Sequence, residues 1–171
     1  MTEMELIESL KSFLETTLQD INQESPSTDI EPHVGSLRTV KLLKTKEITN
    51  TDVKVNIYNG FVPTKAQNKS VFPYISIFLT GGDVDIERCN CKVQFDIGVY
   101  DENDNRSLFN IIRRILNALS SLDNWTLDKK FVLNFPFSWT VLDENKHPYH
   151  QASILTSWSW YAPRPQNFSL I

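Results

Sequence analysis

Residues 72–122 constrain the fold most, because two alternating segments there are followed directly by an amphipathic one. Apolar and polar side chains alternate in residues 74–79 and 92–100, which is the period of a strand with one buried face. Apolar side chains recur every three or four positions in residues 107–122, which is the period of a helix with one buried face. The residues Gly81 to Asp83 between the two strands predict a hairpin turn. This stretch therefore predicts a hairpin followed by a helix, which together build the core.

The buried face of this helix is wider than one stripe. Its expected core positions are Leu108, Ile111, Ile112, Ile115, Leu119 and Leu122. Phe109 and Leu116 lie beside that stripe and widen the apolar arc, so we expect the helix to make contacts on more than one side. Asp104 or Asn105 is the expected N-cap.

A second helix is predicted at the start of the chain, over about residues 3–22. Thr2 followed by Glu5 fits a capping box, and Asn22 with the polar residues after it marks the end. Its expected buried positions are Leu6, Ile7, Leu10, Phe13, Leu14, Leu18 and Ile21. The alternation of apolar and polar residues predicts further strands at 53–58, through 135–141 and at about 150–161. The fold class is therefore α+β.

The length of 171 residues suits one domain, which would bury roughly 70% of the surface of the unfolded chain. Residues 23–52 lack a clear period and are rich in proline and polar side chains, so we interpret them as an extended arm or excursion of that domain. Residues 162–171 are expected to form a loose C-terminal tail.

Charge and hydropathy exclude two classes of function. The formal net charge is -4, with acidic and basic residues mixed along the chain, which argues against a protein that binds nucleic-acid phosphates for affinity. No apolar run approaches the roughly 20 residues needed to span a bilayer. The first ten residues are acidic and amphipathic, unlike a secretory signal, so we expect an intracellular protein without a membrane partner.

The residues that usually carry chemistry form no familiar site. Cys89 and Cys91 have the spacing of one strand face and are expected to be reduced thiols, because no second pair of soft ligands matches them. His147 and His150 lie in or beside a polar connection, which is more often surface than catalytic. No nucleophile, nucleotide-binding or zinc-protease motif occurs. We therefore expect no enzyme activity, no cofactor and no metal ion.

Two acidic turns are the most conspicuous polar features. The first holds Asp83, Asp85 and Glu87, and the second holds Asp101, Glu102 and Asp104. The glycines before the first turn are not followed by a helix start with a lysine, so a phosphate loop is excluded. The second turn lacks the glycine and the final glutamate of a calcium loop. Helix capping is the preferred interpretation of the second turn.

The aromatic strands allow one further alternative. Phe135, Phe137, Trp158 and Trp160 offer ring faces that single-stranded nucleic acid could stack on, but such sites place Arg and Lys on the same face. Their neighbours in the strands are serine and threonine. We therefore expect these rings in the core or in a subunit interface.

The order of segments resembles the tail terminator, or tail completion, proteins of long-tailed phages and prophages of low-GC Gram-positive bacteria. The resemblance covers about residues 53–163 and rests on Asn59-Gly60-Phe61 with Pro63, on Phe72-Pro73-Tyr74, and on the strand from Val93 to Asp101 with the helix after it. It implies a mixed or mainly antiparallel sheet with two main helices packed on one face. It also implies a homo-oligomeric ring, a hexamer, that caps the tail tube and docks to the head.

From this resemblance follow the expected partners: further copies of the chain, the tail tube protein, a head-completion or neck protein, and DNA that only passes through the channel. The expected location is the virion tail, or the bacterial host cytoplasm during assembly. The six acids of the two turns would face the channel or an interface. The alternatives are a head-closure, neck or tail-tube protein and, from a different class, a small-ligand or metal-binding domain.

Overall fold

A computed structural model describes residues 1–19, 54–62, 71–102, 105–142 and 147–162. The arm expected at 23–52 and the tail after residue 162 lie outside the described residues. The elements, in chain order, are α1 (Glu3–Thr17), β1 (Asn56–Asn59), β2 (Tyr74–Val84), β3 (Arg88–Tyr100), α2 (Arg106–Ser120), η3 (Asp123–Trp125), β4 (Thr126–Leu127), β5 (Phe131–Val141) and β6 (Tyr149–Tyr161).

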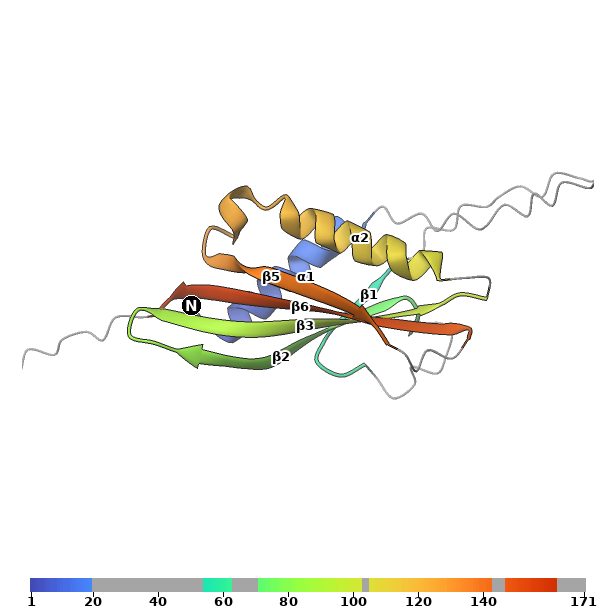
Figure 1. Ribbon diagram of the computed structural model, residues 1–171, viewed down its shortest axis with the longest axis horizontal. Coiled ribbons are helices and arrows are strands. Elements are labelled where there is room, and N and C mark those ends of the chain that lie inside the picture. The colour runs from blue at the N-terminus through green and yellow to red at the C-terminus, as the bar shows by residue number, and fades with distance from the viewer. Residues whose placement is uncertain (20–53, 63–70, 103–104, 143–146, 163–171) are drawn as a thin grey trace, which may run out of the picture.

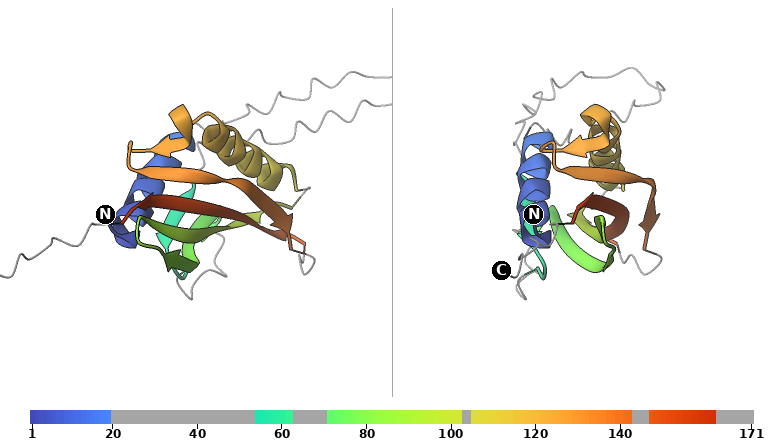
Figure 2. Two further views of the ribbon diagram at one scale, coloured as in Figure 1. Left: turned by 60° about the vertical axis from the view of Figure 1, so that its left-hand side comes forward. Right: turned by 90° about the vertical axis from the view of Figure 1, so that its left-hand side faces the viewer.

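The strands form one sheet in the order β1-β2-β3-β6-β5-β4. The pair β1 and β2 is parallel and every other pair is antiparallel, so the sheet is mixed and mainly antiparallel. The sheet curls, and both long helices cover the same face of it (Figures 1 and 2). The α+β fold with two helices on one face, expected above, is confirmed.

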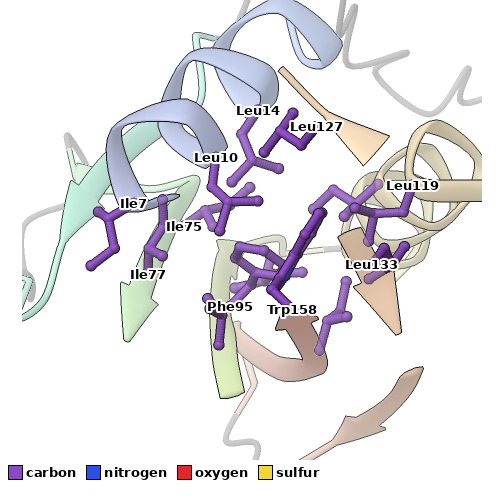
Figure 3. Packing of buried hydrophobic residues seen from close by; sticks show 14 of the residues in the cluster. Ile7, Leu10, Leu14, Ile75, Ile77, Phe95, Leu119, Leu127, Leu133 and Trp158 are labelled. Atoms are coloured by element: carbon purple, nitrogen blue, oxygen red, sulfur yellow. The ribbon is translucent and has the colours of Figure 1, made fainter. Parts of the chain in front are cut away.

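The core lies between the helices and this covered face, around Trp158 and Phe95. Side chains of α1 and α2 converge there, with Leu10 and Leu119 on either side of the Trp158 ring (Figure 3). The buried indole needs a partner for its N–H. Trp158 Nε1 donates to Thr156 Oγ1 at 2.9 Å, and Thr156 Oγ1 donates to the Val93 carbonyl at 3.1 Å. The Trp158 indole and the Thr156 hydroxyl on this face of β6 are therefore both satisfied.

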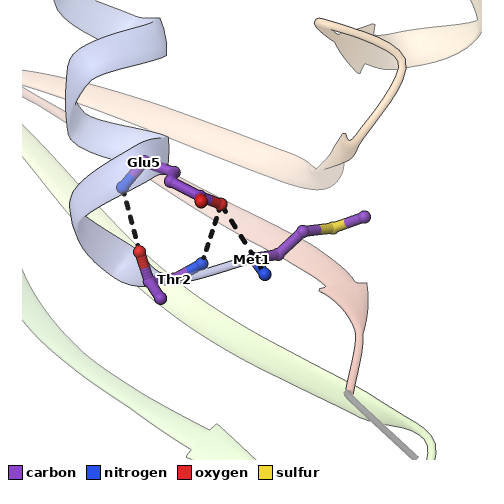
Figure 4. Close-up of polar contacts among 3 residues, drawn as sticks. All are labelled: Met1, Thr2 and Glu5. Atoms are coloured by element: carbon purple, nitrogen blue, oxygen red, sulfur yellow. Dashed lines mark hydrogen bonds and ion pairs between the residues drawn. The ribbon is translucent and has the colours of Figure 1, made fainter.

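Helix α1 begins as the sequence predicts. Thr2 Oγ1 accepts the backbone N–H of Glu5 at 3.3 Å, and Glu5 Oε2 accepts the backbone N–H of Thr2 at 3.1 Å (Figure 4). The capping box is confirmed. The helix ends at Thr17 instead of near residue 22. Thr16 and Thr17 donate their hydroxyls to backbone carbonyls four residues earlier, a bond that weakens the last turn of a helix.

The hairpin turn lies farther along the chain than expected. Strand β2 continues through both glycines to Val84, and the turn begins at Asp85, whose N–H donates to the Arg88 carbonyl at 2.7 Å. Gly81 lies where the register shifts, which marks a β-bulge. A Cβ on Gly82 would lie 2.5 Å from the Asn90 carbonyl oxygen. The glycines therefore allow a bulge and a close approach of two backbones, and they do not form the turn.

Helix α2 buries the expected stripe except Leu122, which lies beyond the helix end at Ser120 and is partly buried, and the helix is not capped as expected. Leu108, Ile111, Ile112, Ile115 and Leu119 are buried. Asn105 occupies the N-cap position without a capping bond from its side chain, and Asp104 lies outside the described residues. Ser107 Oγ instead donates to Asp101 Oδ2 at 2.7 Å, so a hydroxyl of the first turn of α2 holds a carboxylate that follows β3.

Candidate interaction surface

A row of aromatic side chains lies along β5 and the adjoining side of α2. Trp125 contacts Phe135 with ring centroids 4.5 Å apart, and Phe135 contacts Phe137 at 5.2 Å. Phe109 of α2 meets Trp139 edge-on at 6.0 Å. Phe137 and Trp139 share one face of β5, two residues apart, so the two groups of contacting rings adjoin along the strand. We call this row the aromatic stripe; its members are Phe109, Trp125, Phe135, Phe137 and Trp139.

The stripe is exposed to an unusual degree for such large apolar side chains. Phe135 is 53% exposed, Trp139 46%, Trp125 42% and Phe109 39%. Only Phe137 packs against the core. Single exposed apolar residues are normal on a protein surface, but a contiguous apolar group of this kind marks an interaction site. Tryptophan is also among the residues enriched in the hot spots of protein interfaces.

The position of β5 explains why the stripe is uncovered. Within the described chain, β4 pairs only with Phe131 and Val132, so the rest of that edge has no neighbouring strand. Between Asn134 and Ser138 the pairing with β6 is interrupted, and β5 holds two more residues there than β6 does. The extra length carries Phe135 and Pro136 away from the ladder. Pro136 has no N–H to donate, which makes it suited to such an edge.

Trp125 reaches the stripe through a backbone conformation that a bulky residue rarely adopts. Its φ is 56° and that of Asn124 is 49°. The left-handed region costs an L-residue roughly 1–2 kcal/mol. The close contact between the Trp125 and Phe135 rings is one gain that offsets this cost.

Positive charge borders the stripe on the helix side. Phe109 has Arg106 three positions before it and Arg113 four positions after it, which places all three side chains on one side of α2. The helix carries no acidic residue. Lys129 and Lys130 lie in the turn between β4 and β5 and are exposed. The helix side is thus the basic border of the stripe, whereas its Trp125 end has the exposed Asp123 and Asp128 beside the two lysines.

The first acidic turn projects from one end of the sheet. Asp83, Asp85 and Glu87 are exposed and alternate with two aliphatic side chains, Val84 and Ile86, that are 73% and 87% exposed. We call residues 83–87 the hairpin tip. The carboxylates take part only in local bonds: Asp83 accepts from Asn90 Nδ2 at 2.9 Å, and Asp85 accepts from the N–H of Ile86 at 2.7 Å. The aliphatic pair between the acids is the signal that sequence reasoning missed.

The second acidic turn lies at the other end of β3, so the structure does not bring together the predicted acids that it describes (Figure 1). Strand β3 separates them by roughly 40 Å at about 3.3 Å per residue. The backbone N–H of Asp101 donates to the Pro148 carbonyl at 2.9 Å, and the Glu102 carbonyl lies 2.9 Å from His147 Nε2. Asp104 lies outside the described residues. Asp101 and Glu102 thus belong to the junction of β3, α2 and β6.

The predicted thiols lie side by side on the covered face of the sheet. Cys89 and Cys91 are buried and unbridged, opposite Trp160 and Trp158 of β6. Burial, and then the nearby Glu3 carboxylate, raises the pKa of the Cys91 thiol. A shallow hollow of about 440 Å³ reaches Cys91 between the hairpin and Glu3. Within the described ranges, no three or more His, Cys, Asp or Glu side chains gather as metal ligands would.

The open face of the sheet carries one polar network, centred on Asp96. Asp96 Oδ1 accepts from Gln94 Nε2 at 2.7 Å and from Ser153 Oγ at 2.6 Å. Gln151 Nε2 donates to the Tyr74 hydroxyl at 3.3 Å beside it. Burial, and then the Asp96 carboxylate, raises the pKa of Tyr74. The Ser153 bond joins β6 to β3, and the Gln151 bond joins β6 to β2 across β3, so the network ties β2, β3 and β6 together.

Comparison with known proteins gives no relative from which a function follows. No family model matches the chain, and no curated protein matches its sequence. Among solved structures, a crystal structure of the type 4 fimbrial biogenesis protein PilO from Pseudomonas aeruginosa is 14% identical, with a TM-score of 0.31, over 50% of this chain and 53% of that one. The core region of PilO from the same type IV pilus system is also 14% identical, with a TM-score of 0.31, over 52% of this chain and 76% of that one.

These comparisons overturn the resemblance to phage tail terminators. The structures found are pilus biogenesis proteins and not phage tail proteins. The tail function, the neck and tube alternatives and the virion location fall with that resemblance. The match to PilO spans about half the length of its full crystal structure, and it is too distant to carry a function to this chain. No helix in the described ranges is long and apolar enough to cross a membrane.

Proposed function

We propose that this chain is a non-enzymatic protein-binding domain, which associates with further copies of itself through the aromatic stripe. The observation that carries the proposal is two groups of contacting, partly exposed rings that adjoin along β5: Trp125, Phe135 and Phe137 in one, and Trp139 with Phe109 in the other. Burying such rings against a partner removes a large apolar area from water, at about 25 cal/mol per Å². The described part of the chain offers no group of polar side chains comparable in extent to this surface.

The chemistry of the stripe suits a protein partner better than a small molecule. The rings lie along a strand edge and a helix side, so the surface is long and open, whereas small ligands bind in enclosed hollows. Arg113 beside Phe109 also suits single-stranded nucleic acid, which stacks on rings next to basic side chains. The net charge of -4 opposes that partner. Fluorescence titration of the tryptophans with a single-stranded oligonucleotide tests it directly.

The experiment measures the mass of the protein by sedimentation equilibrium from about 1 to 100 µM, the range of weak protein contacts. The stripe variant carries Phe135→Ser and Trp139→Ser. The control carries Phe61→Ser, which removes a ring that is 90% exposed at the end of β1, away from the stripe. Circular dichroism and urea unfolding check that each variant is folded.

We expect the wild-type protein and the Phe61→Ser control to gain mass as concentration rises, and the stripe variant to stay monomeric. The proposal fails if the wild-type protein is monomeric over the whole range. It also fails if the folded stripe variant associates as the wild-type protein does.

A further inference from the structure

We propose that the aromatic stripe of one copy binds the hairpin tip of the next copy, so that the chains associate head to tail. This inference rests on the proposed function and names the surface that the stripe recognises. It follows from three observations. The tip carries exposed aliphatic side chains, and its acidic side chains are opposite in charge to the border of the stripe. The two surfaces cannot meet within one chain.

The tip presents two aliphatic side chains with no packing of their own. Val84 and Ile86 are the most exposed aliphatic residues on the described sheet and its turns, at 73% and 87%. The turn that carries them is held by its own backbone bond between Asp85 and Arg88. Arg88 also lies over the Tyr161 ring, with its guanidinium carbon 5.9 Å from the ring centroid. The tip is thus a protrusion that carries exposed aliphatic side chains and is held at its base by the backbone bond and by Arg88.

The charges of the two surfaces are complementary. Asp83, Asp85 and Glu87 make no ion pair within the described ranges. Arg113, which faces the same side of α2 as Phe109, makes none within those ranges either. When apolar groups of both surfaces pack together, the three carboxylates are brought to the basic border of the stripe. Complementary potentials of this kind select the partner and set its orientation.

The fold keeps the two surfaces of one chain apart. Trp139 pairs with Ile154, which pairs with Phe95 on β3. Phe95 is seven residues from Arg88 at the base of the tip, or roughly 23 Å along the strand. At the nearer end of the stripe, Asn134 beside Phe135 pairs through Ser157 with Lys92, which is four residues, or roughly 13 Å, from Arg88. Both surfaces belong to one hydrogen-bonded sheet, so the tip cannot fold back onto its own stripe. The contact must join two copies through different surfaces, so it gives a two-fold dimer where two copies exchange both contacts, and closed rings or open filaments where each copy binds a different neighbour at each surface.

The test mixes two variants that each lack one surface. The tip variant carries Val84→Ser and Ile86→Ser and keeps its stripe. The stripe variant carries Phe135→Ser and Trp139→Ser and keeps its tip. Each alone is expected to be monomeric at about 100 µM, where weak contacts are populated. Mixed in equal amounts, they are expected to form a dimer with one copy of each, and native mass spectrometry identifies it because the two variants differ in mass.

The outcomes separate this inference from the function on which it rests. If the stripe variant is monomeric while the tip variant associates like the wild-type protein, the stripe binds something other than the tip, and only the inference is overturned. If both variants are monomeric but their mixture gives no dimer, the inference is also overturned. If neither substitution changes association, or the wild-type protein does not associate, both the inference and the proposed function are overturned.

A charge exchange tests the pairing without changing apolar area. Glu87→Lys on the tip and Arg113→Glu on α2 are each expected to weaken association several-fold. The variant with both changes is expected to recover most of it, because the opposite charges then meet again across the interface. Glu15→Lys on α1 is the control for net charge, since Glu15 is exposed and lies away from both surfaces. Equal weakening by all three single changes, without recovery in the double variant, would overturn the pairing.

Discussion

The position of the Tyr74 ring depends on the absence of a side chain at Gly98, which pairs with it on the next strand. Its ring lies over Gly98, where an added Cβ would come within 2.2 Å of the Tyr74 Cε1 atom. The Phe72 ring packs on it with centroids 5.2 Å apart. The phenol is therefore held beside Asp96 in a partly dry position on the open face. Both the burial and the carboxylate disfavour the phenolate.

We predict that this position makes stability fall in alkali. Because the folded-state pKa of Tyr74 is raised above its usual value near 10, the folded protein keeps a proton that the unfolded chain releases. The free energy of unfolding therefore declines as pH rises above about 10 and continues to decline through the folded-state pKa. Urea unfolding between pH 8 and 11 is expected to show a shallower decline for Tyr74→Phe than for the wild-type protein.

Tyr161→Phe is the control, because it removes the hydroxyl of an exposed tyrosine and leaves Tyr74 in place. Parallel declines for the wild-type protein and Tyr74→Phe would show that the phenol of Tyr74 does not contribute to the pH dependence.

The burial of individual residues was predictable from the sequence where they lie on the apolar face of a regular helix or strand. Leu10 and Trp158 sit on apolar faces of a helix and a strand, and both are buried. The role of Gly82 was not predictable. A pair of glycines indicates a turn, and only the pairing of β2 with β3 shows that the Asn90 backbone lies close to Gly82. Phe109 was predictable in part, because its place beside the buried stripe already indicated a second contact.

At the scale of elements, α1 depends on its first turn more than on its last. The capping box satisfies two backbone N–H groups at the N-terminal end, and the carboxylate of Glu5 lies 3.6 Å from the terminal amino group. Leu6, Leu10 and Leu14 of the helix enter the core. Loss of the cap therefore frays the first turn of α1, and the core residue Leu6 lies directly at that turn.

We predict that Thr2→Ala lowers the free energy of unfolding by about 1 kcal/mol, the usual cost of losing an N-cap side chain. Thr16→Ala is the matched control, since Thr16 is an exposed threonine at the other end of α1 whose hydroxyl bonds only to the Ser12 carbonyl. It is expected to be neutral or slightly stabilising. Urea unfolding measures both variants, and equal losses would contradict the role assigned to the cap.

Elements were predictable to the extent that their signals were local. The start of α1, the buried face of α2 and the inward face of β6 follow from period and capping alone. The exposed edge of β5 does not, because the bulge between Asn134 and Ser138 arises from its pairing with β6. The alternation through 135–141 indicated a strand correctly, yet it gave no sign that Phe135 would leave the ladder.

At the scale of the whole molecule, the sequence predicted the class of fold and not the family. A hairpin followed by an amphipathic helix, with aromatic strands after it, is a pattern that unrelated α+β proteins share, because it follows from packing helices on one face of a sheet. The phage resemblance rested on such a pattern without a catalytic or ligand-binding signature. The aromatic stripe and the hairpin tip could be identified only from the sheet order, which places them on separate surfaces.

The head-to-tail arrangement predicts how association depends on salt. The tip is acidic and the border of the stripe is basic, so attraction between copies is expected to weaken as ions screen it. A tenfold rise in ionic strength, from 0.05 to 0.5 M NaCl, shortens the Debye length about threefold. We expect the dissociation constant, measured by sedimentation equilibrium, to rise several-fold over that range, and Arg113→Gln to reduce this dependence. A contact between two stripes would behave in the opposite way, since it brings arginines of both copies together and salt relieves their repulsion. Association that strengthens with salt would therefore favour stripe-to-stripe pairing and contradict the binding of the tip.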